Sequence, residues 1–80
     1  MPELTLYHYV GCAYCARVTS YMQQAGIKIP MKDILKDPAN RQELVKIGGK
    51  GQVPCLVIDG KPLYESLDII EWFKVNYKKP

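Results

Sequence analysis

Two cysteines three residues apart are the most reactive side chains in this sequence. Cys12 and Cys15 stand in the stretch YHYVGCAYCARV, which runs from Tyr7 to Val18. A pair at this spacing is compatible with half of a zinc site, with a structural disulfide, or with a redox-active dithiol. A zinc site would need two further ligands, for which the chain offers Cys55 and His8.

The residues after Cys12 carry a helical pattern. An apolar stripe recurs at spacings of three and four, at Cys15, Val18, Met22 and Ala25. Cys12 is therefore predicted at a helix N-terminus, where unpaired N–H groups and the helix dipole stabilise a thiolate. Cys15 would lie one turn inside, more buried and close enough to form a disulfide. This arrangement makes Cys12 the nucleophile and Cys15 the resolving thiol, with the ring of Tyr14 beside the exposed sulfur.

The rest of the chain supplies the elements that must position this pair. Strands are predicted at residues 4–9, 27–34, 53–58 and 61–64, and helices at residues 13–25, 38–48 and 66–77. Gly26 and Gly48-Gly49 end the first two helices, and Asp37-Pro38 begins the second. Asp59-Gly60 predicts a tight hairpin. For the last helix we expect Ser66 as the N-cap and a buried stripe formed by Leu67, Ile70, Phe73 and Tyr77.

This order of elements predicts an α/β fold. The first strand–helix–strand unit needs a right-handed crossover and gives two parallel strands. A helix follows, then a hairpin of two antiparallel strands, then a last helix. We expect a four-stranded mixed sheet with three helices covering both faces.

Length and composition limit the classes of function. Eighty residues suit one domain, taken as residues 1–80, and a net charge of +3 is too mild to indicate nucleic-acid binding. No apolar run approaches the roughly 20 residues that span a bilayer. An odd number of cysteines and the lack of a secretory pattern favour a reducing, cytoplasmic setting. We expect a monomer without a membrane partner.

The dipeptide Val53-Pro54 is a second signal of function. A proline at the start of a buried strand can be cis at little cost. A cis bond would leave the N–H and C=O of Val53 free of the sheet, where they could pair with an extended, peptide-like ligand. The alternative is a trans proline that merely begins the strand.

With these pieces placed, nearly the whole chain resembles a glutaredoxin of the thioredoxin fold. The sequence C-A-Y-C at Cys12–Cys15 differs by one residue from the C-P-Y-C of that family, and Val53-Pro54 matches its conserved pair. The resemblance implies that the Val53 backbone binds the cysteinyl part of glutathione. It also implies reduction of protein disulfides and glutathione mixed disulfides with electrons from glutathione.

The C-terminal half is also similar to the N-terminal domain of glutathione transferases, over the stretch from Gln52 to Phe73. That resemblance implies that Glu65 and Ser66 bind the γ-glutamyl end of glutathione. A helix start suits a carboxylate, and Glu65 can hold an ammonium group. The alternative is that Ser66 only caps its helix. Transferases typically carry a second, all-helical domain, which this chain lacks, so we expect no conventional transferase.

Several residues depart from the glutaredoxin pattern or stay ambiguous. Tyr9 replaces a frequent lysine, and its hydroxyl either supports the thiolate or only packs. Gln52 replaces a threonine and, with Arg41, is a candidate for the glycyl carboxylate of glutathione. Cys55 is predicted as a buried apolar residue, with a third reactive thiol as the alternative. His8 is predicted to be structural or solvent-facing, with a base beside the thiol as the alternative.

The sequence therefore predicts a glutathione-dependent thiol–disulfide oxidoreductase with glutathione as co-substrate and no metal. Its partners would be disulfide-bonded or glutathionylated proteins. The alternative is a carrier that bridges a [2Fe-2S] cluster between two chains through Cys12 and glutathione. A reconstituted cluster that is lost in Cys12→Ser would indicate the carrier.

Overall fold

The structure, a computed structural model, describes residues 2–77, and its elements follow the predicted order. The strands and helices are β1 (Leu4–His8), α1 (Ala13–Ala25), β2 (Met31–Asp33), α2 (Pro38–Gly48), β3 (Cys55–Ile58), β4 (Lys61–Tyr64) and α3 (Ser66–Asn76). The strands form one sheet in the order β2-β1-β3-β4. β1 pairs parallel with β2, and the other two pairs are antiparallel. The predicted mixed, thioredoxin-like sheet is confirmed.

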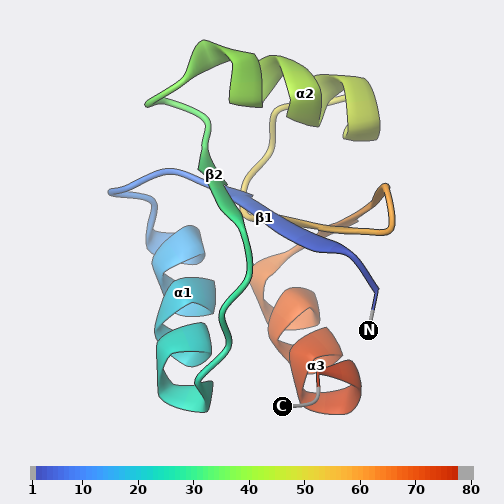
Figure 1. Cartoon of the computed structure of the whole chain (residues 1–80). Helices are drawn as coiled ribbons and strands as arrows, with labels where there is room; N and C mark the ends of the chain where they lie inside the picture. The colour runs from blue at the N-terminus through green and yellow to red at the C-terminus, as the bar shows by residue number, and fades with distance from the viewer. Residues whose placement is uncertain (1, 78–80) are drawn as a thin grey trace.

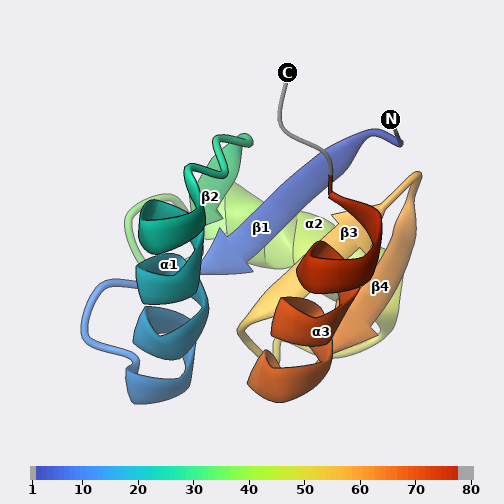
Figure 2. The same cartoon turned by 90° about the horizontal axis from the view of Figure 1, so that it is seen from below.

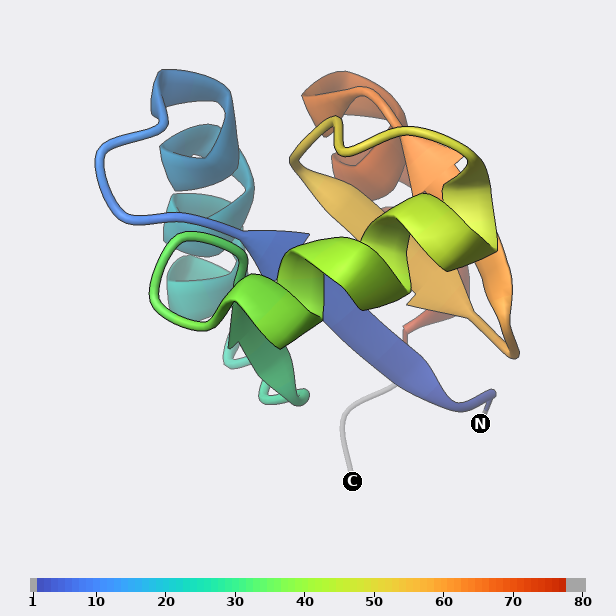
Figure 3. The same cartoon turned by 90° about the horizontal axis from the view of Figure 1, so that it is seen from above.

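The helices cover both faces of this sheet. α1 and α3 lie side by side on one face, and α2 crosses the other (Figures 1 and 2). Seen from above, α2 runs across β1 and β3, and the loops that follow β1 and β2 come together at one end of it (Figure 3). Within residues 2–77 no helix is long and apolar enough to cross a membrane.

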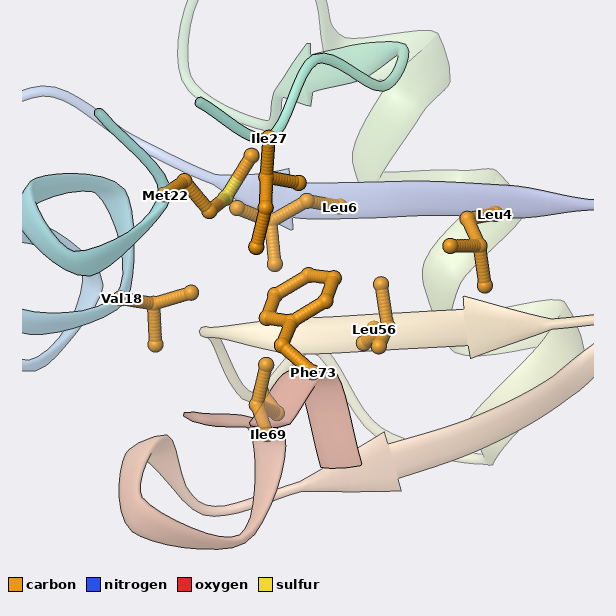
Figure 4. Packing of buried hydrophobic residues seen from close by; sticks show 8 residues of the cluster. All are labelled: Leu4, Leu6, Val18, Met22, Ile27, Leu56, Ile69 and Phe73. Carbon is orange, nitrogen blue, oxygen red and sulfur yellow. The ribbon is translucent and has the colours of Figure 1, made fainter. Parts of the chain in front are cut away.

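Two apolar clusters hold the layers together because side chains alternate across β1. The larger cluster joins the sheet to α1 and α3 around the ring of Phe73 (Figure 4); its buried members are Leu4, Leu6, Val18, Met22, Ile27, Leu56, Ile69 and Phe73. The smaller cluster lies under α2 and consists of Tyr7, Ile34, Leu44, Cys55 and Val57. Leu6 therefore faces one cluster and Tyr7 the other.

Local signals end the elements where the sequence predicts. Gly26 and Gly49 adopt left-handed backbone conformations, with φ of 71° and 80°, after α1 and α2. The Asp37 carboxylate accepts the N–H of Ala39 at 3.0 Å and caps α2. The predicted hairpin turn has positive φ at Asp59 as well as at the glycine that follows it.

The second strand is shorter than the sequence predicts. β2 covers only Met31–Asp33, and Met31 is 42% exposed. Pro30, directly before it, has no N–H to donate, although its C=O accepts the N–H of Leu6 at 3.0 Å. β2 also pairs with one neighbour only, at the edge of the sheet. A strand with one partner and a proline at its start therefore stays short.

The last helix buries a stripe that overlaps the predicted one, and its cap differs from the predicted cap. Phe73 is buried as predicted, and Ile70 and Tyr77 are half-buried against the larger cluster. Leu67 is 64% exposed, and Ile69 is buried instead because contact with the sheet fixes the exact phase of the helix. The N-cap position is occupied by Glu65 rather than Ser66, which is already the first helical residue.

Replacing Phe73 by Ala should destabilise the fold strongly. Phe73 is 2% exposed and sits at the centre of the larger cluster, so the change leaves a cavity that costs about 3–5 kcal/mol. Urea unfolding followed by circular dichroism measures the change. Val75→Ala on the same helix is the control, because Val75 is 69% exposed. Equal losses of unfolding free energy in the two variants would contradict this packing.

Candidate functional site

The chain places Cys12 at the N-cap of α1, as predicted. β1 ends at His8, and Gly11 turns the following loop with a φ of 100°, a conformation that favours glycine. The N–H of Cys15 donates a hydrogen bond to the sulfur of Cys12 at 3.2 Å. Both thiols are free. The first turn of the helix thus binds the Cys12 sulfur through a backbone N–H and carries the Cys15 sulfur on one of its own side chains.

The two thiols differ in exposure. Cys12 is 9% exposed and Cys15 only 1%. Burial, and next the hydrogen bond with the Cys12 thiol, raise the pKa of Cys15 from 9.0 to about 12. Cys15 therefore keeps its proton at neutral pH and lies behind Cys12 as seen from solvent. This asymmetry agrees with the division into nucleophile and resolving thiol that the spacing predicts.

A groove of about 350 Å³ brings together five of the residues predicted to bind glutathione; its lining is Tyr14, Gln52, Val53, Pro54 and Glu65. The predicted cis bond between Val53 and Pro54 is present. β3 begins only at Cys55, and none of the hydrogen bonds found within residues 2–77 uses the N–H or C=O of Val53. These two peptide groups are therefore available to an extended ligand.

The rim of this groove is built at the start of α3. Glu65 has a φ of 73°, an uncommon conformation for a residue with a side chain, and its carboxylate does not cap the helix. That carboxylate instead accepts the side-chain N–H of Gln52 at 3.3 Å. Ser66 follows as the buried first residue of the helix. Such strained positions are concentrated at ligand sites.

Arg41 and Tyr9 lie close to the site but outside this groove. The Arg41 guanidinium packs against Gly51, where an added Cβ would lie 3.1 Å from Nε. The Arg41 side chain therefore lies against Gly51, the residue that directly precedes Gln52 in the chain. The Tyr9 ring packs against the smaller cluster under α2, and the Tyr9 carbonyl accepts the N–H of Cys12 at 3.4 Å. Tyr9 thus packs on this cluster and also lines the hollow that Cys12 and Cys15 share.

Cys12 and Cys15 line a second hollow, of about 300 Å³, which shares no lining residue with the first groove. His8 contributes to this hollow and so lies beside the thiols. Cys55 belongs to the cluster on the opposite face of the sheet and is fully buried. In the part of the chain that the structure describes, no three His, Cys, Asp or Glu side chains gather as a metal site.

Asp33 is a site residue that sequence reasoning missed. One carboxylate oxygen accepts the N–H groups of Leu35 and Lys36 at 2.8 and 2.9 Å, and the other accepts the N–H of Val10 at 3.4 Å. The bonds from Lys36 and Leu35 hold the pKa of the Asp33 carboxyl below its usual value. An aspartate that ends a strand and binds the N–H two residues on is a recognisable local signal. Its bond to Val10 depends on the fold.

Taken together, the fold and the dithiol at the start of α1 define a thioredoxin-like thiol protein. The family model described as the N-terminal domain of glutathione S-transferases matches residues 6–80, so the chain belongs to this family. The match runs well beyond the C-terminal half on which the resemblance to transferases rested. No curated protein matches the sequence.

Solved structures of two kinds resemble this chain. Glutathione transferase Omega 3C from Trametes versicolor is 30% identical over the whole chain, with a TM-score of 0.78. A delta-class glutathione transferase from Nilaparvata lugens is 27% identical over 98% of it, with a TM-score of 0.76. The chain spans only 35% and 38% of the length of these transferases.

A glutaredoxin shares the same fold at lower sequence identity. Glutaredoxin C1 from Populus tremula x tremuloides is 23% identical over 94% of the chain, with a TM-score of 0.70, and the match covers 77% of that protein. At this identity the likeness establishes the fold alone. The expected thioredoxin-like architecture is therefore confirmed by both kinds of relative.

The buried thiol of Cys55 should make the fold less stable in alkali. Burial raises the pKa of Cys55 from 9.0 to about 11 in the folded protein. Above pH 9 the unfolded chain loses this proton while the folded chain keeps it, so stability falls as the pH rises toward 11, by about 1.4 kcal/mol per unit. Cys55→Ala should lose less unfolding free energy between pH 8 and 10.5 than the wild type. Urea unfolding at both pH values measures this difference, and equal losses would contradict it.

Proposed function

We propose that this chain is a glutathione-dependent thiol–disulfide oxidoreductase that works through Cys12 and Cys15. One observation carries the proposal: the first turn of α1 binds the Cys12 sulfur, and the same turn contributes Tyr14 to a groove in which the peptide groups of Val53 are unpaired. The sulfur supports nucleophilic attack on a disulfide. The free peptide groups support capture of a short peptide such as glutathione.

In the proposed complex glutathione lies extended along this groove. The N–H and C=O of Val53 bind its cysteinyl unit, and this holds the glutathione sulfur toward Cys12. The first N–H groups of α3, at Ser66, receive the γ-glutamyl carboxylate, and Glu65 receives the neighbouring ammonium. Gln52, or Arg41 beyond it, holds the glycyl carboxylate.

The first chemical step is attack by the Cys12 thiolate on the glutathionyl sulfur of a glutathionylated protein. A bond forms between the two sulfurs, the original disulfide breaks, and its electron pair leaves with the protein thiolate, which takes a proton from water. A second glutathione thiolate then attacks the glutathionyl sulfur held on Cys12. This step releases oxidised glutathione and restores the Cys12 thiolate.

Cys15 serves a second route, in which the substrate is a protein disulfide. After Cys12 has formed a mixed disulfide with the protein, Cys15 attacks the Cys12 sulfur and releases the protein thiol. Because the pKa of Cys15 is about 12, its proton must leave as it attacks. Two glutathione molecules then reduce the Cys12–Cys15 disulfide. Such a cycle suits the reducing cytoplasm, which is the setting we propose.

Replacing Cys12 by Ser should abolish activity, whereas replacing Cys15 by Ser should not. Without the Cys12 sulfur there is no attacking group, so turnover of a small glutathione mixed disulfide should fall to the uncatalysed rate. Cys15→Ser should keep this activity but lose reduction of protein disulfides. A coupled assay with glutathione and glutathione reductase measures both reactions, with Cys55→Ala as the matched cysteine control. Normal turnover by Cys12→Ser would refute the mechanism.

Replacing Glu65 by Ala should weaken glutathione binding. The change removes one charged partner of the γ-glutamyl ammonium, and a hydrogen bond to a charged group contributes about 1.5–3 kcal/mol. The KM for the glutathione mixed disulfide should therefore rise about tenfold or more, with a smaller effect on kcat. Glu71→Ala is the control, because Glu71 is exposed on the same helix and does not line the groove. Equal KM values in the two variants would contradict the assigned role of Glu65.

A further inference from the structure

We propose that the groove between α1 and the free edge of β2 binds the polypeptide of a protein substrate next to its disulfide cysteine. The occupant is an extended segment with a large apolar side chain beside that cysteine. This inference rests on the proposed function and names the substrate class that the dithiol route selects. It uses the side of Cys12 that faces away from the glutathione groove.

Three neighbouring hollows make up the groove, and they share lining residues. The hollow at the two cysteines shares His8 and Val10 with a larger one of about 540 Å³ that extends to the start of α2. It shares Thr19 with a third, of about 290 Å³, that follows α1 toward its C-terminus. Met31 lines all three hollows. Figure 1 shows α1 and the β2 segment running beside each other along this side of the molecule.

The mouth of the groove presents apolar side chains that the fold holds in place. Val10 is 81% exposed and Met31 is 42% exposed. The N–H of Val10 is bound by the Asp33 carboxylate, which also binds the N–H of Leu35, itself 67% exposed. One carboxylate therefore holds the loops that follow β1 and β2. A surface organised before binding loses little conformational entropy when a partner docks.

The charges around the groove favour an apolar occupant over a charged one. Its ionic side chains balance one another once the pair of Lys32 with Glu43 is counted, since two lysines and two aspartates remain: Lys28, Lys36, Asp33 and Asp37. Lys32 is paired with Glu43 at 2.6 Å, and both carboxylates at the groove accept peptide N–H groups. β2 is an edge strand, and unpaired strand edges accept extended chains. These features together describe an extended, uncharged segment with an apolar anchor.

In the proposed dithiol route the substrate chain becomes linked to a cysteine that lines this groove. In the dithiol route the Cys12 thiolate bonds to one sulfur of the protein disulfide, and the electron pair of the broken bond leaves on the other sulfur. The protein is then linked to Cys12 until Cys15 attacks the Cys12 sulfur and displaces the substrate thiolate. Both cysteines line this groove. We therefore place the residues that flank the linked cysteine over Val10 and Met31, which line the same hollow.

The inference is tested with two disulfide-linked peptide dimers that differ only in the residue after cysteine, Leu or Ser. Wild-type protein should reduce the Leu peptide with a kcat/KM about tenfold higher, as expected for one apolar side chain in an apolar site. In Val10→Ser this preference should shrink to about threefold or less. Val75→Ser should keep it, because Val75 is equally a surface valine but lies on α3, away from the groove.

A trapped complex gives an independent readout. Cys15→Ser protein cannot resolve the mixed disulfide, so the Leu peptide should stay linked to Cys12. Nuclear Overhauser contacts should then join the peptide Leu methyl groups to the methyl groups of Val10 and Met31. Contacts to Val53 and Pro54 instead would place the peptide in the glutathione groove and overturn the inference.

The kinetic outcomes separate this inference from the proposed function. Reduction of both peptides at equal kcat/KM by the wild type would overturn the docking groove and leave the oxidoreductase function intact. An unchanged Leu preference in Val10→Ser would do the same. Failure of the wild type to reduce either peptide or a small glutathione mixed disulfide would overturn the proposed function itself.

Discussion

The site depends on one hydrogen bond, from the N–H of Cys15 to the sulfur of Cys12. The first N–H groups of a helix have no partners within it, and in α1 a sulfur takes the place that a serine or aspartate oxygen usually fills. Because the donor of this bond is the second cysteine, the same turn that binds one thiol buries the other. The chemical inequality of the two thiols thus follows directly from the start of a helix.

The order of the sheet decides what surrounds this turn. β1 lies between β2 and β3, so the loop that leaves β1 has a different neighbour on each side. On one side the approach to β3 exposes the peptide groups of Val53, and on the other the end of β2 supplies Asp33. In the proposed function Cys12 serves the groove at Val53 and the groove at Met31, and this suits a reaction with two different thiol partners.

The carboxylates of the two acidic residues Asp33 and Glu65 differ in how far the fold itself uses them. The Asp33 carboxylate accepts hydrogen bonds from three peptide N–H groups, and these bonds shape the loops that follow β1 and β2. The Glu65 carboxylate has one side-chain contact, to Gln52, and stands exposed on a residue with positive φ. One acid is thus used by the fold, and the other lines a groove. An 80-residue domain has a small core, so such polar bonds help to define loops that burial cannot.

The sequence by itself determined the features that act locally. The helix start at Cys12, the glycine caps and the Asp59-Gly60 turn were predictable because each depends on a few adjacent residues, and so was the cis bond at Val53-Pro54. Tertiary structure decided the rest. Phe73 is buried as predicted, but Ile69 is buried in place of Leu67 because contact with the sheet fixes the exact phase of the helix. The hydrogen bond from Val10 to Asp33 joins residues more than twenty positions apart, and so does the groove that Met31 lines. No local sequence pattern predicts such contacts.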